Sequence, residues 1–294
     1  MMPQRAFLTA ILMVAGADVV VADCFRRTEG IVVEGAVWSP DQSTFAFHSG
    51  SAIYTMPAAG GSMTQIVDDG SWVTWSPDGT RLAYARTVGA EAPDIWVIEL
   101  KTGALQQITT WPGPDTYPDW SHDGDKIAYQ STRDDHVALY VYSFSAGEHA
   151  RLTTLEGSFP DWSPNDDQIT CERNSGPEGA DILVVDYPSG VERQLFSAHR
   201  WLRYPRWHPY DGSLIMIGGN EVGGFPAAMI YVLPSGPLMN VVCCLDDAAF
   251  PEWAPDGVRF SLAEAGDLTI CHMATPVSHS TWGAVKARYG GDRE

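Results

Sequence analysis

The sequence predicts an all-β chain folded as a six-bladed β-propeller of four-stranded antiparallel blades, and two observations support this. The first is a tryptophan that runs into a polar turn and recurs six times, at Trp38, Trp75, Trp120, Trp162, Trp207 and Trp253. Subtracting successive positions gives 37, 45, 42, 45 and 46 residues, a period typical of propeller blades. The second is that short β-branched and aromatic runs, rather than helical patterns, fill each period.

The second unit shows the elements expected in each blade. Its tryptophan strand ends in the turn Ser76-Pro77-Asp78-Gly79, and the apolar run 81–84 follows. The run 94–98 has strong strand preference and is too short for a helix. A glycine turn at 102–103 and the polar-apolar stretch 106–109 complete the unit. Four strands joined by hairpins are therefore expected per unit.

Proline indicates which strand faces the axis. It stands two residues before tryptophan in the last four units, at Pro118, Pro160, Pro205 and Pro251. Because proline cannot donate to a strand ladder, it is tolerated on an edge strand. We therefore expect the tryptophan strand to be innermost, with the indole filling the gap between blades.

The sixth unit lacks a clear fourth strand after its third, 267–271. Two segments could supply it. Either 31–33 folds back from the N-terminal side, or 281–286 is added from the C-terminal side. The sequence does not choose between them, and residues 277–294 are otherwise a C-terminal tail.

The tryptophan turns, the Asp-Ile-Trp-Val strand at 94–97 and the ending Gln-Ile-Thr-Thr at 107–110 resemble the propeller repeat of TolB-type proteins. The resemblance covers about residues 30–276. It implies a propeller that serves as a protein-binding platform in the periplasm. TolB itself carries an α/β domain before its propeller, whereas the first repeat here follows the leader almost directly.

Residues 1–17 have the layout of a secretory signal peptide, with Arg5, an apolar run over 6–14 and the small residues 15–17. Cleavage after Ala22 is an alternative. Two further interpretations are a lipoprotein anchored through Cys24 and a segment that is not cleaved and forms a buried strand. Export to the periplasm or secretion is expected.

The net charge of −19 argues against nucleic-acid binding, because an acidic surface repels phosphate backbones. No other segment is long and apolar enough to span a membrane. We expect a monomer without a cofactor, although a divalent cation could bind.

The five cysteines, at 24, 171, 243, 244 and 271, form no disulfide framework, and a single bridge from Cys271 to Cys243 or Cys244 stays open.

Enzyme signatures are weak. No Gly-x-Ser-x-Gly motif occurs, and we expect no hydrolase domain after the propeller because the sequence ends at Glu294. Propeller lyases that act on uronic-acid sugars look similar and use histidines around a metal. The eight histidines here are scattered, and we expect His122 and His208 to be exposed turn residues. Three histidines converging on the axis would favour the lyase.

The residue before tryptophan gives the candidate site. It is Val37 and Thr74 in the first two units and charged in the others, at Asp119, Asp161, Arg206 and Glu252. If these side chains bend toward the axis, the channel mouth holds three carboxylates and one guanidinium, which suits a cation or a basic peptide. The alternative is that each is an ion-paired or solvated group without a ligand. No catalytic and no metal residues are assigned.

The function predicted is a non-enzymatic protein-binding or peptide-binding scaffold of the periplasm or cell envelope. A metal-dependent polysaccharide lyase, or another carbohydrate-active propeller enzyme, is the alternative.

Overall fold

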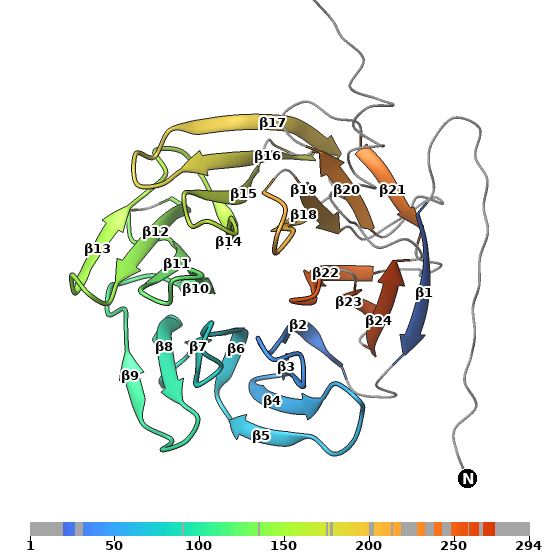
Figure 1. Cartoon of the computed structure of the whole chain (residues 1–294). Helices are drawn as coiled ribbons and strands as arrows, with labels where there is room; N and C mark the ends of the chain where they lie inside the picture. Colours follow the sequence, from blue (N-terminus) through green and yellow to red (C-terminus); the bar gives the residue numbers. More distant parts are fainter. Residues whose placement is uncertain are drawn as a thin grey trace, which may run out of the picture.

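The computed structural model describes residues 20–26, 32–89, 91–134, 136–174, 176, 179–199, 203–212, 214–218, 228–232, 238–242, 248–257, 259–264 and 267–273. The regular elements in these ranges are β-strands, which form mostly antiparallel sheets arranged radially around a central channel (Figure 1). The prediction of an all-β propeller with antiparallel four-stranded blades is therefore confirmed, apart from the number of blades.

Four sheets have four strands each. The first holds β2 (Glu34–Trp38), β3 (Thr44–Ser49), β4 (Ala52–Pro57) and β5 (Thr64–Val67). The second holds β6 (Gly70–Trp75), β7 (Arg81–Arg86), β8 (Asp94–Glu99) and β9 (Leu105–Gln107). The third holds β10 (Asp115–Trp120), β11 (Lys126–Ser131), β12 (Ala138–Ser143) and β13 (Glu148–Arg151). The fourth holds β14 (Ser158–Trp162), β15 (Gln168–Asn174), β16 (Gly179–Asp186) and β17 (Glu192–His199).

The fifth sheet has eight strands, in the order β18-β19-β20-β21-β1-β24-β23-β22. Its members are β18 (Arg203–Trp207), β19 (Leu214–Gly218), β20 (Ala228–Val232), β21 (Leu238–Val242), β1 (Val20–Arg26), β24 (Asp267–Met273), β23 (Arg259–Glu264) and β22 (Ala248–Trp253). It therefore contains the last two tryptophan units.

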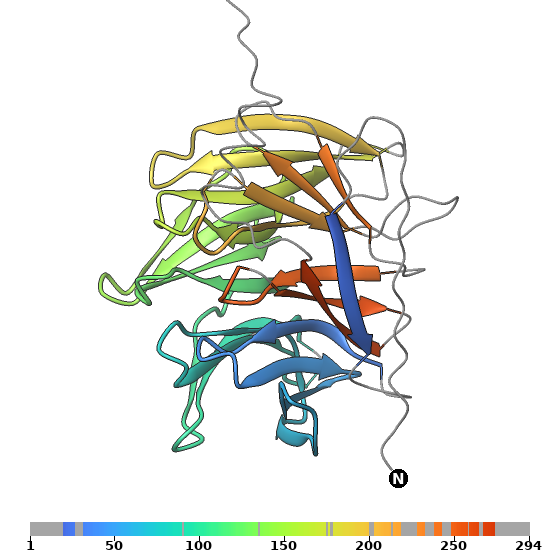
Figure 2. The same ribbon diagram turned by 45° about the vertical axis from the view of Figure 1, so that its right-hand side comes forward.

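The prediction of six blades is wrong, because the structure has five, the last of them double. The physical reason is β1, which uses both of its edges. It pairs in parallel with β21 through Val20 and Val21, and it pairs antiparallel with β24 from Ala22 to Arg26. Figure 2 shows β1 lying along β24 at the outer rim of the ring. Backbone hydrogen bonding thus continues from β21 into β24, and no sheet edge separates the last two units.

The strand beside β24 is also neither of the two segments expected there. It comes from the N-terminal side, as one alternative had it, but it consists of Val20–Arg26 rather than residues 31–33. Residues 32 and 33 lie outside any strand, and the other candidate, 281–286, lies outside the described residues.

The tryptophan strands are innermost, as the prolines predicted (Figure 1). Each of these six strands also contains a β-bulge, which the sequence did not predict. In β10 the pairing with β11 shifts between Thr116 and Asp119, so Pro118 stands within the irregularity. A proline there breaks no regular ladder bond.

The tryptophans lie between neighbouring blades. Trp120 of β10 packs in one buried cluster with Ile95 and Val97 of β8 in the preceding blade. Trp38 clusters in the same way with Leu268 and Ile270 of β24. These contacts bury apolar surface from two sheets at once, which stabilises the ring.

One cysteine, Cys271 on β24, is disulfide-bonded. Cys24 of β1 stands directly opposite it in the strand register, while Cys171 is buried and free. Cys243 and Cys244, the partners considered from the sequence, lie outside the described residues. In the described ranges no helix is long and apolar enough to cross a membrane.

Candidate binding site in the channel

The channel wall is built in layers, because the six inner strands repeat the same positions around one axis. A side chain at a fixed distance before tryptophan in one strand therefore faces the corresponding side chains of the other strands. Two of these layers surround the axis: an aromatic layer three residues before tryptophan and a charged layer one residue before it.

The aromatic layer was missed by the sequence analysis, although its signal was present in five of the six units. Its members are Trp72, Tyr117, Phe159, Tyr204 and Phe250. All five have positive φ, between 52° and 59°, because they stand at the bulges of the inner strands. Left-handed backbone is costly for such residues, so the surrounding sheet must hold it in place.

The five rings contact one another in sequence around the axis. Their centroids are 4.2 to 4.7 Å apart from Trp72 through to Phe250. The circle closes where Trp72 meets Phe250 at 5.3 Å. The sixth position in this layer is Gly35, also at positive φ, which leaves room for the indole to reach across. The rings narrow the channel at this end.

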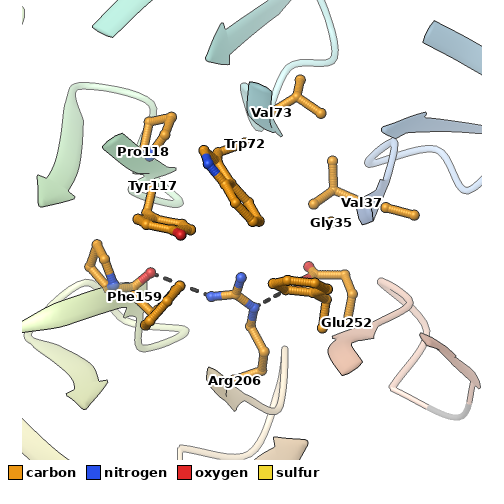
Figure 3. Close-up of a pocket in the computed structure, with 12 residues that line it drawn as sticks. Gly35, Val37, Trp72, Val73, Tyr117, Pro118, Phe159, Arg206 and Glu252 are labelled. Carbon is orange, nitrogen blue, oxygen red and sulfur yellow. Dashed lines mark hydrogen bonds and ion pairs between the residues drawn. The ribbon is translucent and has the colours of Figure 1, made fainter. Parts of the chain in front are cut away.

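The charged layer contains the four residues predicted from the sequence, and the structure brings them together. Figure 3 shows the Arg206 guanidinium extended toward the axis beside Glu252. Its Nε lies 3.0 Å from Glu252 Oε2, and one Nη lies 3.5 Å from Asp161 Oδ1. Val37 and Thr74 occupy the equivalent places on β2 and β6, so one side of the layer is uncharged.

Two of the carboxylates also join neighbouring blades. Asp119 Oδ2 accepts the backbone N–H of Trp162 in the next blade at 2.8 Å. Asp161 Oδ2 accepts the N–H of Trp207 in the blade after that at 2.6 Å. One oxygen of each carboxylate is thus used for structure, and the sequence analysis did not foresee this role.

Burial raises the pKa of all three acids in the layer to about 7. For Asp119 the negative charge of Asp161 adds to the shift, whereas Arg206 opposes it. For Asp161 and Glu252, too, burial raises the pKa and the positive charge of Arg206 lowers it. Carboxylates withdrawn from water hold their protons more strongly unless a cation compensates them.

The space beside the charged layer differs on its two sides. Toward the aromatic rings lies a small cavity of about 40 Å³, which Trp72, Tyr117 and Glu252 help to line. Toward the tryptophan turns lies a chamber of about 330 Å³. We call it the turn-side chamber. Its wall contains the three carboxylates, the six repeat tryptophans, His122, His208 and the turn prolines 40, 77, 209 and 255.

The two turn histidines differ from each other. His122 is exposed, as predicted, and its Nδ1 lies 3.1 Å from Asp166 Oδ1. Burial alone would lower the pKa of His122, but Asp166 and the channel acids raise it above its usual value. His208 is buried, so the prediction of an exposed residue is wrong there.

The reason is that His208 holds its turn together. Its Nδ1 accepts the N–H groups of Tyr210 and Asp211, and its Nε2 lies 3.1 Å from the carbonyl oxygen of Gly257. Within the described ranges, the structure contains no group of three or more His, Cys, Asp or Glu side chains that could hold a metal ion.

Comparisons with known proteins agree with this architecture. An uncharacterized peptidase, YuxL of Bacillus subtilis, is 30% identical over 193 residues, which are 62% of this chain and 27% of the relative. The chain therefore spans about a quarter of that relative's length.

Two solved structures share the fold at low sequence identity. A putative TolB from Agrobacterium tumefaciens has a TM-score of 0.67 and 19% identity, over 86% of this chain and 98% of that one. An oligogalacturonate lyase in complex with manganese has a TM-score of 0.58 and 16% identity, over 95% and 98% of the two chains. At these identities the likeness establishes the fold alone, and it extends to an enzyme as well as to TolB.

The family model described as the TolB beta propeller domain matches residues 71–255. This match spans more than half of the sequence. Of the inner strands that form the channel wall, it covers four from end to end. The chain therefore belongs to the TolB β-propeller family.

Proposed function

We propose that the protein is a non-enzymatic scaffold of the periplasm or cell envelope, and that its turn-side chamber binds a basic segment of a protein partner. The observation that carries this proposal is the composition of the charged layer, which holds three carboxylates and one guanidinium; among the described residues, the guanidinium is paired to Asp161 and Glu252 only. With its acids ionised the layer has an excess of negative charge. A lysine or arginine side chain of a partner would supply the missing cation.

The shape of the chamber supports a side chain rather than a free ion. About 330 Å³ is ample for a long side chain and its neighbours. The uncharged side of the layer, at Val37 and Thr74, offers contacts to an aliphatic stem, and the tryptophan and proline side chains continue that apolar wall. Basic side chains commonly bury their stems and keep the charged end polar.

Access from the tryptophan turns also follows from the geometry. The contacting aromatic rings narrow the opposite end, whereas the turn-side chamber is larger and is bordered by Tyr210, which is 68% exposed. A partner segment is therefore expected to enter over the turns and to end at the charged layer.

The first test is the affinity for a fluorescein-labelled peptide of alternating lysine and glycine, measured by anisotropy at pH 8 and about 0.15 M salt. That salt concentration screens exposed charges beyond roughly 8 Å. The channel variant carries Asp119→Asn, Asp161→Asn and Glu252→Gln. The control variant carries Asp68→Asn, Glu148→Gln and Glu156→Gln, which remove the same charge at exposed positions.

We expect the channel variant to bind at least about tenfold more weakly, since losing a partly desolvated charge pair costs a few kcal/mol. The control variant should stay within about twofold of the wild type. Equal losses in both variants would mean that the peptide only follows the overall net charge of −19, and the proposal would fail.

The absence of catalysis is tested separately. The protein is incubated with oligogalacturonate and manganese, and formation of unsaturated uronic products is followed by ultraviolet absorbance. We expect no product above a no-protein control. Product formation that depends on the protein would replace the scaffold proposal with the lyase alternative.

A further inference from the structure

The charged layer contains more acids than cations, and the groups around it do not restore the balance. Asp161 and Glu252 share the single guanidinium of Arg206. Among the described residues, no cation lies within 4 Å of Asp119, whose Oδ2 accepts only the Trp162 N–H. A backbone N–H compensates a carboxylate less than a full positive charge does.

The other elements around the layer add little charge. β2 and β6 contribute Val37 and Thr74, which do not titrate. Tyr117 lies on the side of the aromatic rings, and Tyr210 borders the turn-side chamber. Of the two histidines, His208 is occupied by backbone groups, so His122, paired with Asp166, is the other group there that can change its charge near neutral pH.

We propose that this layer takes up a proton near neutral pH, and that the proton and the basic group of the partner compete for the same carboxylates. This inference rests on the proposed function and adds its regulation. Protonation supplies the missing positive charge when the chamber is empty, and a lysine or arginine side chain supplies it when the partner is bound. The burial that raises the pKa of the three acids to about 7 supports this exchange.

The direction of the pH response follows from linkage. Binding of a cation that displaces one proton weakens on acidification, by up to about tenfold per pH unit below the pKa of the layer. Protonation of His122 would act in the same direction, because it adds a positive charge beside the chamber. The experiment must therefore distinguish the acids from the histidine.

The first measurement uses the unliganded protein, so it does not depend on the proposed partner. Thermal unfolding is followed from pH 5 to pH 8 for the wild type, for Asp119→Asn and for Asp68→Asn. The asparagine at position 119 can still accept the Trp162 N–H, so the join between the blades is kept. Asp68 is an exposed aspartate outside the channel.

An acid whose folded pKa is raised binds more protons in the folded state than in the unfolded state, between its unfolded pKa of about 4 and its folded pKa of about 7. Its contribution to stability is therefore lost as the pH rises through this window. We expect the Tm of the wild type to fall relative to that of Asp119→Asn between pH 5 and pH 8. Parallel profiles for these two proteins would overturn the proposal, and Asp68→Asn should parallel the wild type.

The second measurement repeats the peptide titration at pH 6 and pH 8. We expect the wild type to bind the peptide several-fold more weakly at pH 6 than at pH 8. The affinity of Asp119→Asn should change less between the two pH values, and that of His122→Gln should change as much as that of the wild type. Loss of the pH dependence in His122→Gln would assign the proton to the histidine and overturn the proposal. If the peptide binds at neither pH, the proposed function fails, while the unliganded profiles still decide whether the layer holds the proton.

Discussion

Replacing Asp161 with alanine should destabilise the fold more than replacing it with asparagine, because the carboxylate joins two blades. Asp161 Oδ2 accepts the backbone N–H of Trp207 at 2.6 Å, and Trp207 is only 4% exposed. Alanine leaves that N–H without its acceptor, which costs about 1–3 kcal/mol. Asparagine offers a carbonyl oxygen at nearly the same place. At about 2–4 °C per kcal/mol for a chain of this order of size, the alanine variant should melt roughly 2–12 °C below the asparagine variant.

The assay is thermal unfolding at pH 8, followed by circular dichroism. Both variants remove the same negative charge beside Arg206, so the difference between their Tm values isolates the hydrogen bond. If alanine and asparagine at position 161 melt at the same temperature, the carboxylate does not join the blades and this reasoning is refuted.

Three further predictions concern the aromatic layer, the disulfide and the N-terminus. Because Phe159 has a φ of 54°, Phe159→Gly should be at least as stable as Phe159→Ala in chemical denaturation, contrary to the usual order; a clearly more stable alanine variant would contradict the strained backbone. Reducing agent should lower the Tm of the wild type but not of Cys271→Ser, and equal responses would mean that Cys271 carries no stabilising bridge. Cleavage of the expected leader should leave a chain that begins at Asp18 by intact mass, since β1 starts at Val20; a start at Asp23 would remove the β1–β21 pairing.

The sequence predicted the inner wall of the propeller well because that wall is periodic. Tryptophan, the proline two residues before it and the charged residue one before it recur at fixed offsets, so a strand position in one unit implies the same position in the others. Asp119, Asp161, Arg206 and Glu252 could be placed around one axis for this reason. The aromatic layer was equally periodic and could have been found by the same comparison of units.

The features that were missed depend on contacts between distant parts of the chain. β1 directly follows the segment expected to be a leader, and nothing in its own sequence indicates that it pairs with β21 and β24 at once. The count of blades depended on that pairing. The buried place of His208 likewise depends on the carbonyl of Gly257, which is 49 residues away in the sequence.

The measurement that tests the binding site most directly is ¹⁹F NMR of the protein labelled with 5-fluorotryptophan, titrated with the lysine-glycine peptide. Single Trp→Phe variants assign the resonances. The structure predicts that Trp120, Trp162 and Trp207, which line the turn-side chamber, shift on binding, whereas the outlying Trp111, 38% exposed, does not. Shifts confined to Trp111, with the chamber resonances unchanged at saturation, would place the peptide outside the channel and contradict the proposed site.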